Sequence, residues 1–192
     1  MDQFIFLAAE ESDLSDRACF CKRRPFDMRL LDYRNVPVLR FIRPLRCDRA
    51  CCFCCLQARI LAQELEVQAP KGTVIGSVRM DFSLIFPSFS ILDSAENLVL
   101  KIKGPLCTLS FCCEDVVFEI FTANGATKLG HVIKIYTGFV QECCTDADNY
   151  SLVFPFDLDV KIKAVLLGAL ILIVSASSSL GELLSDRAVK FP

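Results

Sequence analysis

The chain has 192 residues, of which 53% are hydrophobic and 23% charged, and its formal net charge is −2. A composition this rich in apolar residues excludes wholesale disorder, and the length fits one domain. The near-neutral charge argues against a protein that binds nucleic acid through its net charge. There are 12 cysteines but only one histidine, His131, so a metal centre with several histidines is excluded. No phosphate loop or nucleophile elbow appears, and we do not expect an enzyme.

Most of the chain is predicted to form short strands separated by turns. The first two are expected at residues 4–7 and 26–31, the second with alternating apolar and polar positions typical of a half-buried strand. Residues 60–67 are compatible with either a helix or a strand. Further strands are predicted at residues 36–42, 73–78, 88–92, 98–102, 116–121, 131–136 and 152–156. Asn124-Gly125 indicates a hairpin turn, and the spacing favours an antiparallel barrel or sandwich.

The C-terminal part contains one strongly apolar run at residues 164–174. A membrane span needs about 20 apolar residues, so this run is read as a buried core helix over residues 160–174, with a short span as the alternative. Asp157 or Asp159 is placed to cap the start of that helix. We therefore expect one domain over residues 1–175, followed by a polar tail over 176–192. Residues 1–9 lack the features of a secretory signal.

A cluster of five cysteines follows a basic stretch of the chain. Residues 22–49 hold nine basic and three acidic side chains, a local charge of +6, and Cys47, Cys51, Cys52, Cys54 and Cys55 overlap its end. Zinc is one interpretation, but no second pair of cysteines has clean zinc-ligand spacing. Attachment of acyl chains to the cysteines is the preferred interpretation, because acyl chains and a basic patch together give stable membrane anchoring. Packing of the thiols in the core is the third.

An acidic segment of 12 residues runs from Asp146 to Asp157, with aspartates at positions 1, 3 and 12. Clustered carboxylates suit Ca²⁺, and an EF-hand loop places acidic residues at these positions. The other positions match poorly, since Tyr150 stands at position 5 and Ser151 at position 6. The alternative is a turn over residues 146–149 and a helix cap at Asp157. Any calcium affinity is expected to be weak, about 10⁻⁴–10⁻³ M.

Several strings of residues together resemble the phospholipid scramblase family, in order and over most of the chain to about residue 173. They include Arg43-Pro44-Leu45-Arg46-Cys47, the Cys51 to Cys55 cluster, Glu66-Val67-Gln68-Ala69-Pro70, Lys101-Ile102-Lys103-Gly104-Pro105, Thr145-Asp146-Ala147-Asp148-Asn149 and Phe154-Pro155-Phe156-Asp157-Leu158-Asp159. The resemblance implies a mainly β fold similar to the tubby domain, a closed antiparallel β-barrel around a buried hydrophobic C-terminal helix. Because this chain begins after the early strands of the family, its barrel could lack those strands and keep an open edge.

The resemblance also implies a function. It implies Ca²⁺-dependent, ATP-independent, bidirectional movement of phospholipids between leaflets, with phospholipids and the membrane surface as partners. The protein would be anchored to the cytoplasmic face of the plasma membrane by S-palmitoylation of Cys51, Cys52, Cys54 and Cys55. Calcium would be held by Asp146, Asp148, Tyr150, Leu152, Phe154 and Asp157, of which Tyr150, Leu152 and Phe154 would contribute only backbone carbonyls or water. The alternative function is a lipid-binding or signalling adaptor without transport, because a barrel filled by its own helix has no lumen.

Overall fold

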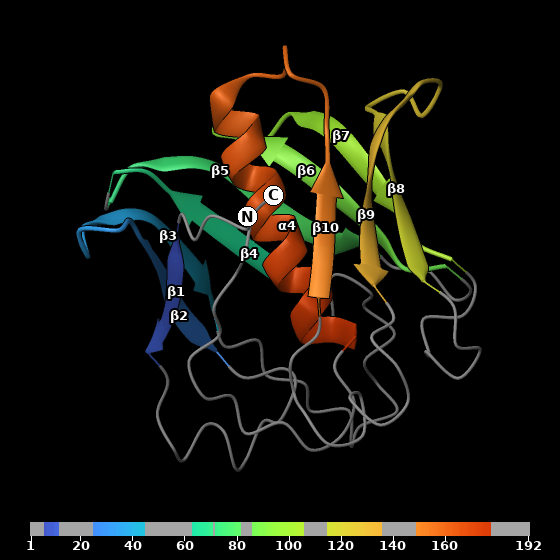
Figure 1. The fold of residues 1–192 in the computed structure, drawn as a ribbon. Coiled ribbons are helices and arrows are strands. Elements are labelled where there is room, and N and C mark those ends of the chain that lie inside the picture. The colour runs from blue at the N-terminus through green and yellow to red at the C-terminus, as the bar shows by residue number, and fades with distance from the viewer. Residues whose placement is uncertain are drawn as a thin grey trace, which may run out of the picture.

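Within the residues that the computed structural model describes, the chain forms one antiparallel sheet and one helix (Figure 1). The described residues are 6–11, 25–44, 63–70, 72–81, 86–105, 115–135 and 149–177. The strands are β1 (Leu7–Glu11), β2 (Phe26–Leu31), β3 (Pro37–Arg43), β4 (Glu64–Gln68), β5 (Val74–Asp81), β6 (Ser88–Asp93), β7 (Leu98–Lys103), β8 (Val116–Thr122), β9 (Lys128–Ile135) and β10 (Asn149–Val153). The helix is α4 (Val160–Ser177).

The sheet is a simple meander in which every strand pairs with the next one along the chain. Its order is β1 to β10, and each pairing is antiparallel. The mainly β fold with a C-terminal helix is therefore confirmed. A closed barrel is not: the sheet stays open, with β1 and β10 as its two outer strands in the described part of the chain.

Several observed elements have other bounds than the predicted ones, and three of them show why. The first strand begins at Leu7 rather than residue 4, because its position is set by pairing with β2, for example Ala8 opposite Leu30. The ambiguous residues 60–67 contribute a strand, β4, whose register is fixed by neighbours on both sides. The last strand ends at Val153 instead of residue 156, because Pro155 follows and proline cannot donate to a ladder.

The core lies between the concave face of the sheet and α4. The side chains of β2 alternate as predicted, with Phe26, Met28 and Leu30 buried. The helix contacts β4, β5 and β6, and Figure 1 shows it lying across these strands. Val165, Leu166, Ala169 and Leu172 are fully buried against the core.

The helix is not enclosed equally on all sides. Ala164, Leu167, Ile171 and Val174 recur at helical spacing and are only half-buried. A core helix buried all round was expected, and the open sheet explains the difference because it does not wrap completely round α4. Over the residues that are described, no helix has the length and apolar character needed to cross a membrane.

Two glycines allow the helix to lie close to the sheet. A Cβ atom at Gly168 of α4 would lie 2.8 Å from Cγ2 of Val67, and one at Gly76 of β5 would lie 2.7 Å from Cγ2 of Val165. Both distances are shorter than atoms can approach without a shift of the neighbours. These positions therefore set the spacing between α4 and strands β4 and β5.

Antiparallel order makes the connections alternate between two ends of the sheet. The end at which β2 leads into β3, β4 into β5, β6 into β7, β8 into β9 and β10 into α4 is called the turn end. The opposite end, at which each odd-numbered strand leads into the next even-numbered strand, is called the connection end. At the turn end, carboxylate Oδ1 of Asp93 accepts hydrogen bonds from the amides of Ala95 and Asn97, at 2.8 and 2.9 Å. The backbone and side-chain hydrogen bonds from Asn97 lower the pKa of Asp93. The predicted Asn124-Gly125 turn is also present, with Gly125 at φ +71°.

Candidate functional site

The predicted acylation site lies outside the described residues. Cys51, Cys52, Cys54 and Cys55 belong to the connection between β3 and β4, so their modification stays a prediction. The sheet order nevertheless says where this connection starts and ends: Arg43 closes β3 and Glu64 opens β4, both at the connection end.

All 12 cysteines belong to connections of this kind. They belong to the connections β1–β2, β3–β4, β7–β8 and β9–β10, each of which joins an odd-numbered strand to the next even-numbered one. An antiparallel meander returns all such connections to the same end of the sheet. The four connections that carry the cysteines therefore begin and end at the connection end of the sheet.

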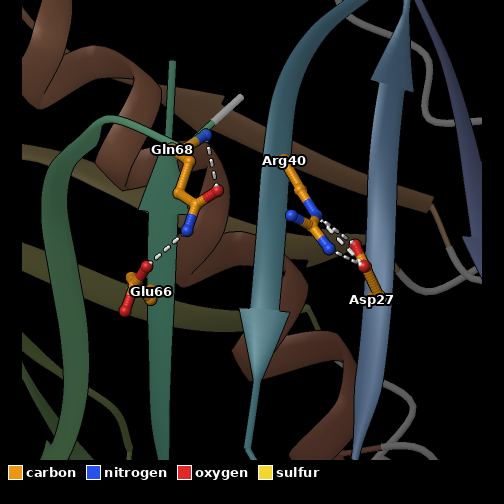
Figure 2. Close-up of polar contacts among 5 residues, drawn as sticks. Asp27, Arg40, Glu66 and Gln68 are labelled. Carbon is orange, nitrogen blue, oxygen red and sulfur yellow. Dashed lines mark hydrogen bonds and ion pairs between the residues drawn. The ribbon is translucent and has the colours of Figure 1, made fainter. Parts of the chain in front are cut away.

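The basic residues of segment 22–49 are more dispersed than a single patch. Arg40 donates from Nε to both carboxylate oxygens of Asp27, at 2.9 and 3.0 Å, and also forms an ion pair through Nη2 (Figure 2). Arg43 is buried, with its guanidinium 5.7 Å from the ring centroid of Phe26. Arg34 lies at the turn end, stacked on Tyr33 at 5.0 Å.

Five of the nine basic residues remain next to the cysteines in sequence. Lys22, Arg23 and Arg24 stand in the β1–β2 connection, and Arg46 and Arg49 in the β3–β4 connection. Both connections begin and end at the connection end. If the cysteines are acylated as predicted, these five residues are the ones that would add electrostatic attraction to a membrane surface.

The predicted calcium segment is divided by a β-strand. Asp146 and Asp148 lie outside the described residues, before β10. Tyr150, Leu152 and Phe154 pack against the core, so their side chains do not gather around an ion. Asp157 is exposed in the turn after β10. Within the described ranges, no three His, Cys, Asp or Glu side chains come together.

The extended backbone of β10 separates the two acidic groups. Four residue steps of a strand span about 13 Å, so residues 149 and 153 differ in position by that distance. An EF-hand loop instead folds its ligands around one ion. Asp146 and Asp148 thus precede β10 in the sequence, whereas Asp157 follows it at the turn end.

The helix cap is Asp159, one of the two predicted candidates. Its Oδ1 accepts a hydrogen bond from the amide of Lys161 at 2.7 Å, and its carbonyl accepts one from the amide of Lys163 at 2.9 Å. Asp157 lies two residues earlier, outside the capping position. The carboxylate of Asp157 therefore does not cap α4.

A cluster that the sequence reasoning missed lies where β10 leads into α4. The Lys163 ammonium donates to the carbonyl oxygen of Phe156 at 2.6 Å. The same ammonium lies 5.7 Å from the ring centroid of Phe154 and 5.2 Å from that of Phe156. The sequence could have indicated this cluster, because Lys163 stands on the first turn of a predicted helix and two phenylalanines, Phe154 and Phe156, precede that helix.

An open antiparallel meander around an apolar C-terminal helix, with a cysteine-rich end, defines a mainly β class of fold. The family model described as Scramblase matches residues 1–176, and the chain belongs to this family. No solved structure matches the chain.

Curated relatives agree with this assignment. The chain is 43% identical over 171 residues to phospholipid scramblase 1 of Homo sapiens, which covers 89% of this chain and 52% of that protein. It is 42% identical over 173 residues to phospholipid scramblase 2 of Bos taurus, covering 90% and 57%. It is 38% identical over 169 residues to phospholipid scramblase family member 5 of Homo sapiens, covering 88% and 60%. The chain thus spans about half the length of the first relatives.

Proposed function

We propose that this chain promotes ATP-independent, bidirectional movement of phospholipids between membrane leaflets, under the control of Ca²⁺. The observation that carries the proposal is the family match over residues 1–176, supported by relatives named phospholipid scramblases. Moving a lipid between leaflets makes and breaks no covalent bond. We therefore assign a transport function rather than an enzymatic one.

We further propose that acyl chains on Cys51, Cys52, Cys54 and Cys55 hold the protein at the cytoplasmic face of the plasma membrane. The support is the density of cysteines and the five basic residues in connections that share one end of the sheet. One acyl chain gives only marginal binding, so several are needed for stable attachment.

Replacing all four cysteines by serine should move the protein from the membrane fraction to the soluble fraction of cells. Each single replacement should release much less protein, because the remaining chains still anchor it. The matched control replaces Cys112 and Cys113, which belong to another connection, and should leave partitioning unchanged. Unchanged partitioning of the fourfold variant would refute the anchor.

Ca²⁺ is proposed to bind within residues 146–157. Asp146 and Asp148 would provide carboxylates before β10 and Asp157 one after it, while Tyr150, Leu152 and Phe154 would offer only their backbone carbonyls. Calcium prefers such oxygen ligands. Because the extended strand β10 lies between the two acidic groups, we expect Asp146 and Asp148 to supply most of the ligands and Asp157 to contribute little.

Reconstitution into vesicles tests the proposed activity. Vesicles with a fluorescent lipid in both leaflets are treated with a membrane-impermeant quencher, with millimolar Ca²⁺ or with a chelator. The chain should expose label from the inner leaflet only with Ca²⁺. Asp148→Ala should abolish this response, whereas Glu96→Ala, an exposed acidic residue outside the segment, should keep it. Equal inner-leaflet protection in protein-containing and empty vesicles would refute transport.

A lipid-binding adaptor without transport is the second candidate, and the position of α4 favours it. Leu166, Ala169 and Leu172 are fully buried between the helix and the sheet, so side chains fill the interior of the fold. A polar head group therefore has no route through this core. Vesicle binding without lipid movement, at any Ca²⁺ concentration, would support the adaptor.

A further inference from the structure

The connection between β10 and α4 forms an apolar tip at the turn end, defined here as residues 153–160. Phe156 is 97% exposed and Val160 is 78% exposed, the two highest values among the large apolar side chains that the structure describes. Val153, at the end of β10, is 46% exposed. Single exposed apolar residues are common, but three within eight residues form a local cluster.

The fold holds Phe156 outward. Phe154 and Leu158, on either side of it, pack against the core and fix both flanks of the tip. The Lys163 ammonium holds the carbonyl oxygen of Phe156 at 2.6 Å, and Asp159 caps the helix that follows. With both flanks fixed, the phenyl ring cannot turn into the core without breaking these contacts.

The chemistry of the tip suits the boundary between lipid head groups and acyl chains. An aromatic ring and valines would enter the apolar layer, while the ammonium groups of Lys161 and Lys163 would stay near the phosphates. Asp157 and Asp159 in the tip are balanced by Lys161 and Lys163 just after it, so residues 153–163 together carry no net charge. Attraction to the tip should therefore depend on apolar insertion more than on anionic lipid.

We propose that this tip inserts into the interfacial layer of a phospholipid bilayer, with Phe156 and Val160 as the inserted side chains. The choice of a bilayer as the partner rests on the proposed function, since the relatives are named for phospholipids. The tip lies at the opposite end of the sheet from the cysteine-bearing connections. It is therefore a membrane contact separate from the acyl anchor.

The absence of tryptophan from the chain allows a direct test. Phe156→Trp places one fluorophore at the tip, and Val117→Trp places one on β8, where the native side chain is 37% exposed. Each full-length variant, prepared without acyl groups and in chelator, is mixed with phosphatidylcholine vesicles. Emission from position 156 should shift to shorter wavelength and be quenched by lipids brominated on their acyl chains, whereas emission from position 117 should do neither.

Vesicle sedimentation supplies an independent measurement. The pair Phe156→Ser and Val160→Ser should weaken partitioning of the un-acylated chain by about tenfold or more, the order expected for losing a buried phenyl ring. The matched pair Val117→Ser and Ile135→Ser, from exposed sites at the opposite end, should change it less than about twofold. Circular dichroism of the unchanged chain and the two double variants checks that all three are folded.

The outcomes separate this inference from the proposed function. An unshifted, unquenched signal at position 156 would overturn insertion and leave a protein as the alternative partner for the tip. Equal shifts at both positions would overturn it as well, because they would show contact that is not specific to the tip. Lipid movement without insertion of the tip would support the proposed function and refute this inference. Insertion without lipid movement would keep the tip as a membrane contact and refute transport.

Discussion

At the scale of single residues, one aspartate side chain caps the start of α4. Asp159 has the geometry of an N-cap, accepting the amide of Lys161 at 2.7 Å, and Asp157 does not. Sequence alone leaves both residues open, because each is an acceptor within a few residues of the same apolar run. The choice depends on where the first helical turn starts, and the helix begins at Val160, directly after Asp159.

Asp159→Ala should lower the free energy of unfolding by about 0.5–2 kcal/mol, because an amide at the start of α4 loses its acceptor. Asp157→Ala is the matched control and should change it by less than about 0.5 kcal/mol in chelator, as an exposed residue away from the cap. Urea unfolding of the two variants beside the wild type gives both values. A larger loss for Asp157→Ala would contradict the assignment of the cap.

At the scale of elements, α4 and the sheet are held at a short distance by glycines. Gly168 lies beside Val67 and Leu65 of β4, and no periodicity argument singles it out within a long apolar run. The sequence correctly predicts an apolar C-terminal helix that packs against the core. It does not predict which strands the helix contacts, because that depends on the curvature of a ten-stranded sheet.

Gly168→Val should destabilise the fold by about 1–3 kcal/mol, because its Cβ and methyl groups would overlap with Val67 and push α4 from β4. Ala164→Val, on the half-buried side of the same helix, should cost less than about 1 kcal/mol, mainly through helix propensity. Thermal unfolding of both variants measures the difference. Equal melting temperatures would show that the contact at Gly168 relaxes freely.

For the whole molecule, local patterns predicted more than long-range ones. Alternation in β2, the Asn124-Gly125 turn and the buried C-terminal run are all visible within a few residues, and all are present in the fold. Openness of the sheet is not local, since it depends on whether β1 and β10 meet. The same holds for the calcium segment: its spacing suggests one loop, but pairing of β10 with β9 holds the middle of it extended.

The alternation of connections also bears on how family members can diverge in length. Connections 32–36, 69–73, 94–97 and 123–127 are tight turns in which Asn35, Glu96, Gly72 or Gly125 adopts a positive φ. An insertion there would shift the register of two strands and turn apolar side chains to the wrong face. Connections 12–25, 44–63, 104–115 and 136–148 are much longer, between 12 and 20 residues each. Insertions and deletions among homologues should therefore accumulate at one end of the sheet, leaving the other nearly constant in length.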